Sequence, residues 1–197
     1  MTFSFVGPWA TAGVFTRSLT CFAARELAFH SDQTATQDGQ VPVFFLHRAL
    51  HLLVRGNGVT KKLSRTTVRT LLEQFGLPPD DPQARPLLVT EGSAQGKRRA
   101  IEGNPYLSHA LRRLRERRGP TVVFGSRLSD QDAHLAEALN EHPERPVAVS
   151  MRPGTKQALA PKQMAIFARL RANRLLSFDA TTHPLGSSDL RIPDRNL

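Results

Sequence analysis

The segment 121–132, TVVFGSRLSDQD, combines residue types that can hold a nucleotide. Residues 121–124 have the character of a buried strand, Gly125 permits a tight turn, and Ser129 is a suitable helix cap. Such an arrangement leaves free backbone N–H groups at the carboxyl end of a sheet, where nucleotides commonly bind. Asp132 is most simply a helix-start residue. The spacing therefore predicts a site around Gly125 without indicating a reaction.

His47 is a second candidate, because it directly follows the β-branched and aromatic run 41–46. An imidazole, with a pKa of about 6.5, could take a proton from a ribose hydroxyl at the carboxyl edge of a sheet. A lone histidine at a strand end is more often structural. On a helix, His47 and His51 would form half a metal site, but Arg48 replaces the glutamate of the zinc-protease motif. We expect no metal site.

The segment 91–98, EGSAQGKR, superficially resembles a phosphate-binding P-loop. Only three residues separate Gly92 from Gly96, where the motif requires four, and Arg98 replaces the residue that would hold magnesium. ATP hydrolysis by this route is therefore excluded. Ser126 and Ser129 also lie outside the G-x-S-x-G elbow of α/β hydrolases.

The chain is basic, with 27 Lys and Arg against 17 Asp and Glu and a formal net charge of +10. Part of the excess lies between residues 91 and 120. A basic surface can attract polyanions, although such a run is more often a solvated helix face. The alternative function is therefore a non-catalytic basic module that binds nucleic acid or a protein partner. Its candidate residues are Arg112, Arg113, Arg115, Arg117 and Arg118.

The 197 residues, of which 40% are hydrophobic, suffice for one domain with a core. Cys21 is the single cysteine, so a disulfide framework is excluded and a reducing compartment is the simpler interpretation. The apolar start lacks the positive region of a secretory signal. No apolar run reaches the roughly 18 residues that a membrane span needs. We expect a soluble, cytoplasmic protein.

Apolar runs and helical patterns alternate along the chain from Val41 onwards. This alternation predicts an α/β fold, with a mainly parallel sheet and flanking helices. We expect a poorly defined segment over residues 1–40, the α/β domain over 41–191 and a tail over 192–197. The predicted strands are 41–46, 87–90, 121–124, 147–150 and 175–178. The predicted helices are 64–75, one capped by Asn104, one begun by Ser129 and one begun by Pro161.

Several short motifs, in order, resemble a bacterial family known as domain of unknown function 4917, which is related to sirtuin-like NAD-binding domains. The matching stretches are 45–52, 88–93, 122–132, 147–150, 177–179 and 183–186, with Lys97, Ile101, Asn104, Tyr106 and Leu107. The resemblance implies a Rossmann-like fold and NAD as cofactor. It implies that His47 is the catalytic base at the NAD ribose and that Gly125 and Ser126 lie beside the adenosine half, with Ser150 as a further neighbour.

The chain departs from the sirtuin-like pattern in two places. Arg48 stands where a glycine usually follows the histidine, and a bulky cation there obstructs close backbone approach. Residues 1–40 contain neither the Gly-Ala-Gly phosphate loop nor the later asparagine segment. The chain thus resembles the carboxyl-terminal portion of such a domain and looks incomplete at its N-terminus. We expect a degenerate NAD-cleaving hydrolase with impaired activity, or a chain that joins a protein partner or oligomer supplying the missing parts.

Overall fold

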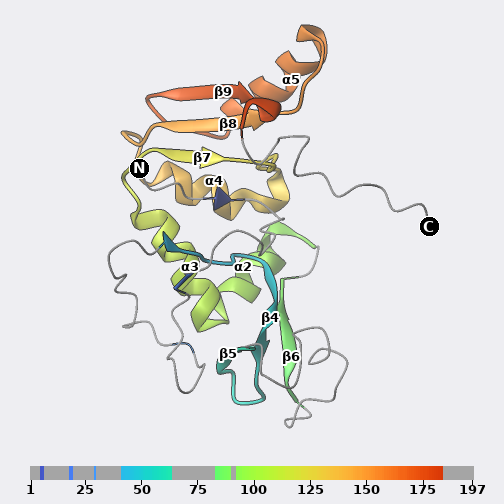
Figure 1. Cartoon of the computed structure of the whole chain (residues 1–197), viewed down its shortest axis with the longest axis vertical. Coiled ribbons are helices and arrows are strands. Elements are labelled where there is room, and N and C mark those ends of the chain that lie inside the picture. Colours follow the sequence, from blue (N-terminus) through green and yellow to red (C-terminus); the bar gives the residue numbers. More distant parts are fainter. Residues whose placement is uncertain are drawn as a thin grey trace, which may run out of the picture. The chain divides into compact units, whose positions relative to one another are not determined.

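The structure, a computed structural model, describes residues 5–6, 18–19, 29, 41–63, 83–89 and 92–183. The chain divides into two compact units. Unit 1 comprises Met1–Ala10 and Leu114–Leu197, and unit 2 comprises Thr11–Arg113. Figure 1 shows the elements of both units, coloured along the sequence.

Unit 1 contains a parallel sheet whose strands follow one another in space in the same order as in the sequence, β1-β7-β8-β9. Each neighbouring pair is parallel. Parallel neighbours need a long crossover connection, and helices supply it on either side of β8. The strands are β1 (Phe5–Val6), β7 (Thr121–Val123), β8 (Val147–Met151) and β9 (Leu175–Asp179). The helices are η1 (Asp130–Asp132), α4 (Ala133–Asn140), α5 (Lys156–Phe167) and η2 (Ala180–Thr182).

One face of this sheet is buried more completely than the other. Val123 and Val149 are paired across β7 and β8 and have no exposed surface, whereas Val122 and Ala148 in the next row are half-buried. Val149 also pairs with Ser177, whose hydroxyl accepts a hydrogen bond from Gln163 of α5 at 3.0 Å. Because alternate residues of a strand share a face, α5 lies on the fully buried face.

Arg145 is the largest fully buried side chain of the described residues. Its guanidinium donates to the carbonyl oxygens of Leu114 and Arg115 at 3.1 and 3.0 Å, and to that of Ala138 at 3.5 Å. The last carbonyls of a helix have no partner within the helix, so a buried donor there stabilises the helix end. Arg145 thereby joins the carboxyl ends of α3 and α4.

Unit 2 contains an antiparallel sheet of order β5-β4-β6 and a short parallel pair. The turn between β4 and β5 contains Gly58, whose φ is +80° and whose N–H donates to the Arg55 carbonyl. The strands are β2 (Ser18–Leu19), β3 (Val41–Pro42), β4 (Arg48–Val54), β5 (Thr60–Lys62) and β6 (Arg85–Leu88). Helix α2 is Ala94–Glu102, and α3, Pro105–Glu116, runs across the boundary between the units.

Helix α3 begins as the sequence predicts. The Asn104 side chain accepts a hydrogen bond from the Leu107 N–H at 3.0 Å, and Pro105 occupies the first helical position. The Asn104 amide also donates to the Thr60 hydroxyl of β5 at 3.0 Å. One buried residue thus caps the helix and fixes it to the sheet of unit 2.

The predicted α/β fold class is confirmed, with a parallel sheet and helices consistent with a Rossmann-like fold. The expected strand 41–46 is wrong, because β3 ends at Pro42 and the long strand β4 begins after His47. The expected strand 87–90 is shifted to 85–88 and belongs to the antiparallel sheet.

Helix α5 begins five residues before the expected Pro161. Thr155 caps it by accepting a hydrogen bond from the Ala158 N–H at 3.3 Å, and Pro161 lies inside the helix. The expected helix 64–75 lies outside the described residues, and the boundaries expected at residues 41 and 191 stay predictions. Within the described part of the chain, no helix is both long and apolar enough to cross a membrane.

Candidate functional site

Gly125 and Ser150, two of the predicted nucleotide-binding residues, are in direct contact at the carboxyl edge of the parallel sheet. Gly125 follows β7 with a φ of +71°, a conformation that favours glycine. Its N–H donates to the Ser150 hydroxyl oxygen at 3.0 Å, which ties the turn after β7 to the end of β8. A serine hydroxyl that accepts this bond still has its own proton to donate to a ligand.

Ser126, the third predicted residue, holds the turn in shape. Its hydroxyl oxygen accepts a hydrogen bond from the Leu128 N–H at 3.2 Å. Leu128 has a φ of +45° yet a side chain with no exposed surface. A left-handed conformation costs a non-glycine residue about 1–2 kcal/mol, so burial of this side chain holds the backbone there. No local pattern predicts this conformation at Leu128, because leucine rarely adopts it.

Ser129 was expected to cap the following helix with its side chain, and this is wrong. The Ser129 hydroxyl instead donates to the Asp132 carboxylate at 3.4 Å, while its backbone carbonyl accepts from the Asp132 N–H at 2.8 Å. The segment therefore begins as the short helix η1 before α4. Asp130 pairs with Arg169 at 2.8 Å, although the Asp130 side chain is 91% exposed.

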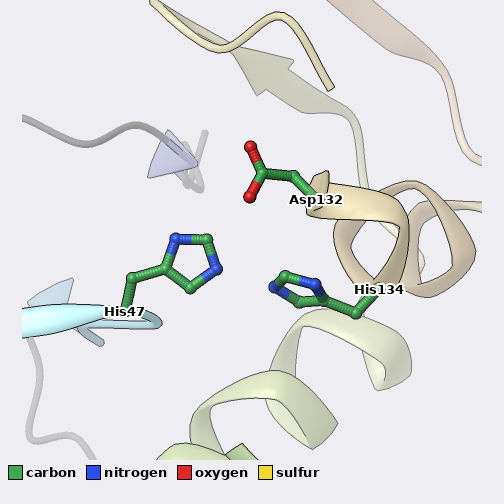
Figure 2. A group of neighbouring side chains, drawn as sticks. All are labelled: His47, Asp132 and His134. Carbon is green, nitrogen blue, oxygen red and sulfur yellow. The ribbon is translucent and has the colours of Figure 1, made fainter. Parts of the chain in front are cut away.

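Asp132 and His134 both come from the start of α4, as Figure 2 shows. Asp132 is half-buried and His134 is almost completely buried, with 1% of its surface exposed. The sequence does not single out His134, because it lies among the buried apolar residues of α4 and no motif includes it.

His47, the predicted base, lies in the bend that precedes β4 and is half-buried. Its backbone carbonyl accepts a hydrogen bond from the Val89 N–H at 2.6 Å. Because His51 lies on β4, the two histidines are not on a helix, and the half metal site considered for them at helical spacing does not form. His47 belongs to unit 2 and the other predicted site residues to unit 1, and its catalytic role stays a prediction.

Aromatic rings lie close to Ser150 at the carboxyl edge of the parallel sheet. Ser150 pairs with Phe178 of β9, and the His183 ring lies 6.0 Å from the Phe178 ring and 5.0 Å from the Phe124 ring, between ring centres. Flat rings at the end of a sheet offer a surface on which a base can stack. We call Phe124, Gly125, Ser126, Ser150, Phe178 and His183 the edge cluster.

The edge of the sheet also carries exposed positive charge. Arg127 follows β7, and Arg152 and Lys156 follow β8; all three are exposed, and no ion pair joins them to another described residue. Asp179 ends β9, where its carboxylate accepts from the N–H and the hydroxyl of Thr181 at 2.8 and 2.7 Å. These two hydrogen bonds lower the pKa of Asp179. The three exposed cations favour an anion at the ends of β7 and β8, whereas the Asp179 carboxylate opposes one at the end of β9.

Residues 93–98 of the segment that superficially resembles a P-loop form the cap and the start of helix α2. Ser93 caps α2, its hydroxyl oxygen accepting from the Gly96 N–H at 3.1 Å. The serine and glycine of this segment thus act as a helix cap, as they do at many helix starts.

The profile of the family described as a domain of unknown function (DUF4917) matches residues 15–182. The chain belongs to this family. The DUF4917 match covers all of the described parts of unit 2 and every residue of the edge cluster except His183. No curated protein and no solved structure matches the chain significantly.

Proposed function

We propose that this DUF4917 protein binds a nucleotide, NAD or a relative of it, at the edge cluster of unit 1. The observation that carries the proposal is the hydrogen bond from Gly125 to Ser150, which joins the ends of two neighbouring parallel strands where α/β sheets commonly bind nucleotides. The relationship to sirtuin-like NAD-binding domains is part of the same proposal.

The residues around this bond suit the separate parts of a nucleotide. The rings of Phe124, Phe178 and His183 can stack a base, and the Ser150 hydroxyl can donate to a sugar oxygen. Phosphates would be drawn to the exposed cations that follow β7 and β8. The N–H groups of Gly125 and Leu128 are already bonded to serines, which favours charge over a backbone phosphate loop as the means of holding phosphate.

Isothermal titration of the whole chain with NAD tests the proposal. Ser150→Ala removes the hydroxyl that joins the strand ends, and we expect about tenfold weaker binding, the loss of roughly one hydrogen bond. Ser177→Ala is the matched control, because Ser177 lies on the next strand and on the other face of the sheet, and it should bind NAD as the unchanged chain does. Binding that is absent, or that Ser150→Ala leaves unchanged, contradicts the proposal.

We further propose that cleavage of NAD, with His47 as base, is impaired in this chain. Arg48 and the lack of a Gly-Ala-Gly loop within residues 1–40 support this proposal. Little nicotinamide should be released from NAD by the whole chain, measured by chromatography. Robust release of nicotinamide that disappears in His47→Ala would contradict the proposal of impaired cleavage and establish an active NAD-cleaving hydrolase.

The alternative, a basic interaction module, rests on the arginines near the end of α3. Arg115 lies 3.9 Å from Glu141 and Arg118 lies 3.5 Å from Glu144, so acids offset part of this charge. Salt-dependent DNA binding that is lost when Arg112 and Arg113 become glutamates would favour the alternative.

A further inference from the structure

Strand β9 forms one edge of the parallel sheet, and its outer side pairs with no described strand. Edge strands in natural proteins are usually protected by lysine, proline, a bulge or an inward charge. The first four residues of β9, Leu175 to Phe178, are uncharged, and the pairing with β8 contains no bulge. Leu176 is 48% exposed. β9 thus offers backbone donors and acceptors together with apolar surface.

Helix α5, which lies on β9, also has apolar residues on a side that does not face the sheet. Ile166 is buried on the inner side, whereas Met164 is 71% exposed and Ala160, one turn earlier, is exposed too. A surface helix normally keeps its outer side polar, and a helix that is apolar all round is normally covered on all sides. A second apolar contact for α5 is therefore expected.

The ion pair of Arg169 shows which way the exposed side of α5 faces. Arg169, in the turn that ends α5, reaches Asp130 at the start of the α4 segment at 2.8 Å, so this side faces α4. At about 100° per residue, Met164 and Ala160 lie roughly 140° and 180° away from Arg169 around the helix axis. They consequently face the opposite side, over the outer edge of β9. In Figure 1, α5 and β9 lie together at one end of unit 1.

We propose that this edge of unit 1, formed by β9 and the Ala160 and Met164 side of α5, binds a second copy of the chain. A two-fold axis perpendicular to the sheet and passing beside Ser177 would pair the two β9 strands antiparallel. Leu176 then lies opposite the partner's Phe178, and the reverse pair forms on the other side of the axis. Such apolar pairs stabilise antiparallel strands.

A second copy fits better than an unrelated strand, because one symmetric contact covers both exposed surfaces. Both copies carry α5 on the same face of the continued sheet, so the two helices meet across the axis through Met164 and Ala160. A foreign strand would cover β9 and leave the side of α5 exposed. The surface is small, because β9 is about 17 Å long and α5 about 18 Å. Small interfaces are typically weak, and we expect a dimer that dissociates in the micromolar range.

Sedimentation velocity of the whole chain, from about 5 to about 200 µM, is the test. The unchanged chain should pass from monomer to dimer over this range. Leu176→Lys and Met164→Lys each place two like charges at the symmetric contact, and each should weaken dimerisation by about tenfold or more. Circular dichroism and thermal unfolding should stay unchanged, because both side chains are exposed in the single chain.

Two control variants separate this surface from general surface hydrophobicity. Leu88→Lys changes a leucine that is 45% exposed on an edge strand of unit 2, and Ala165→Lys adds the same charge elsewhere on α5. Both should dimerise like the unchanged chain. A chain that stays monomeric at 200 µM, for example because its own residues cover the edge, overturns the proposal, and so does a dimer that Leu88→Lys weakens and Leu176→Lys does not.

Discussion

The strands of the parallel sheet have clear proline and glycine signals at their ends, whereas those of the antiparallel sheet do not. This difference explains why the candidate site lies at the end of the parallel sheet. In the parallel sheet, β7 and β8 begin directly after Pro120 and Pro146, and β7 ends two residues before Gly125. In the antiparallel sheet, β4 follows an apolar stretch without such boundaries. Sharp strand ends hold the edge cluster in place, whereas the pairing of β4 with β6 is interrupted by an irregularity in register between Ala49 and Leu53.

The largest effect expected in either unit comes from Arg145. In Arg145→Ala, three carbonyl oxygens lose a buried donor and a large cavity opens, so we expect the free energy of unfolding of unit 1 to fall by about 3–5 kcal/mol. Urea titration followed by the amide NMR signals of β8 measures it. The exposed Arg174 provides the control, since Arg174→Ala should change stability by less than about 0.5 kcal/mol. Equal effects of the two variants would show that the buried contacts do not hold the helix ends.

Gly125 and Gly58 provide a direct test of this difference, because among the described residues each is the glycine of its unit that combines positive φ with open space around the Cβ position. Gly125→Ala and Gly58→Ala should each lower the free energy of unfolding by about 1 kcal/mol. Only Gly125→Ala should also weaken NAD binding in calorimetry. Gly92→Ala, at an open position without positive φ, should leave both quantities unchanged. Weaker NAD binding in Gly58→Ala would place the nucleotide outside the edge cluster.

The smallest effect expected is a difference in acid sensitivity. Burial, with a lesser contribution from Lys62, lowers the pKa of His51 in unit 2. The unfolded chain then binds more protons than the folded chain between the lowered pKa and about 6.5, so stability in this window falls as the pH falls. In unit 1, the pKa of Asp179 is lowered in the folded state. Its contribution to the free energy of unfolding is therefore complete above about pH 3.9, the pKa in the unfolded chain, and is lost as the pH falls through the lower pKa of the folded chain.

Urea titrations at pH 7 and pH 5, followed by amide NMR signals of β4 and β8, check this difference. The free energy of unfolding reported by the β4 signals should be lower at pH 5 than at pH 7. In His51→Gln this decrease should be smaller. An acid effect on β4 that persists fully in His51→Gln would assign it to another group.

Local signals predicted the parallel sheet and the start of α3 well. Asn104 followed by Pro105 specifies a helix start within a few residues, and the structure has it there. The start of α5 was missed because Pro161 is a strong signal, yet Thr155 caps the helix and the helix tolerates the proline. The strand predicted over residues 41–46 is wrong for the opposite reason. Apolar character continues from Val41 to Val54, and it does not indicate where one strand ends and the next begins.

The candidate site could be predicted in part. Gly125 and Ser150 meet because parallel strands end at one edge, which the order of elements already implies. The left-handed Leu128 and the ring of His183 beside Phe124 depend on packing among distant residues, and no local pattern specifies them.

The pairing of β1 with β7 has a kinetic consequence during synthesis. Phe5 pairs with Val122, 117 positions later, because 122 minus 5 is 117. A ribosome that adds about 5–20 residues per second needs roughly 6–23 s to complete this interval. Strands β7, β8 and β9 can find one another soon after they emerge, whereas β1 must wait, unpaired, until the rest of its sheet exists. Of the described strands, β1 is made before the others and is among the last to be placed, and chaperones have that interval in which to protect it.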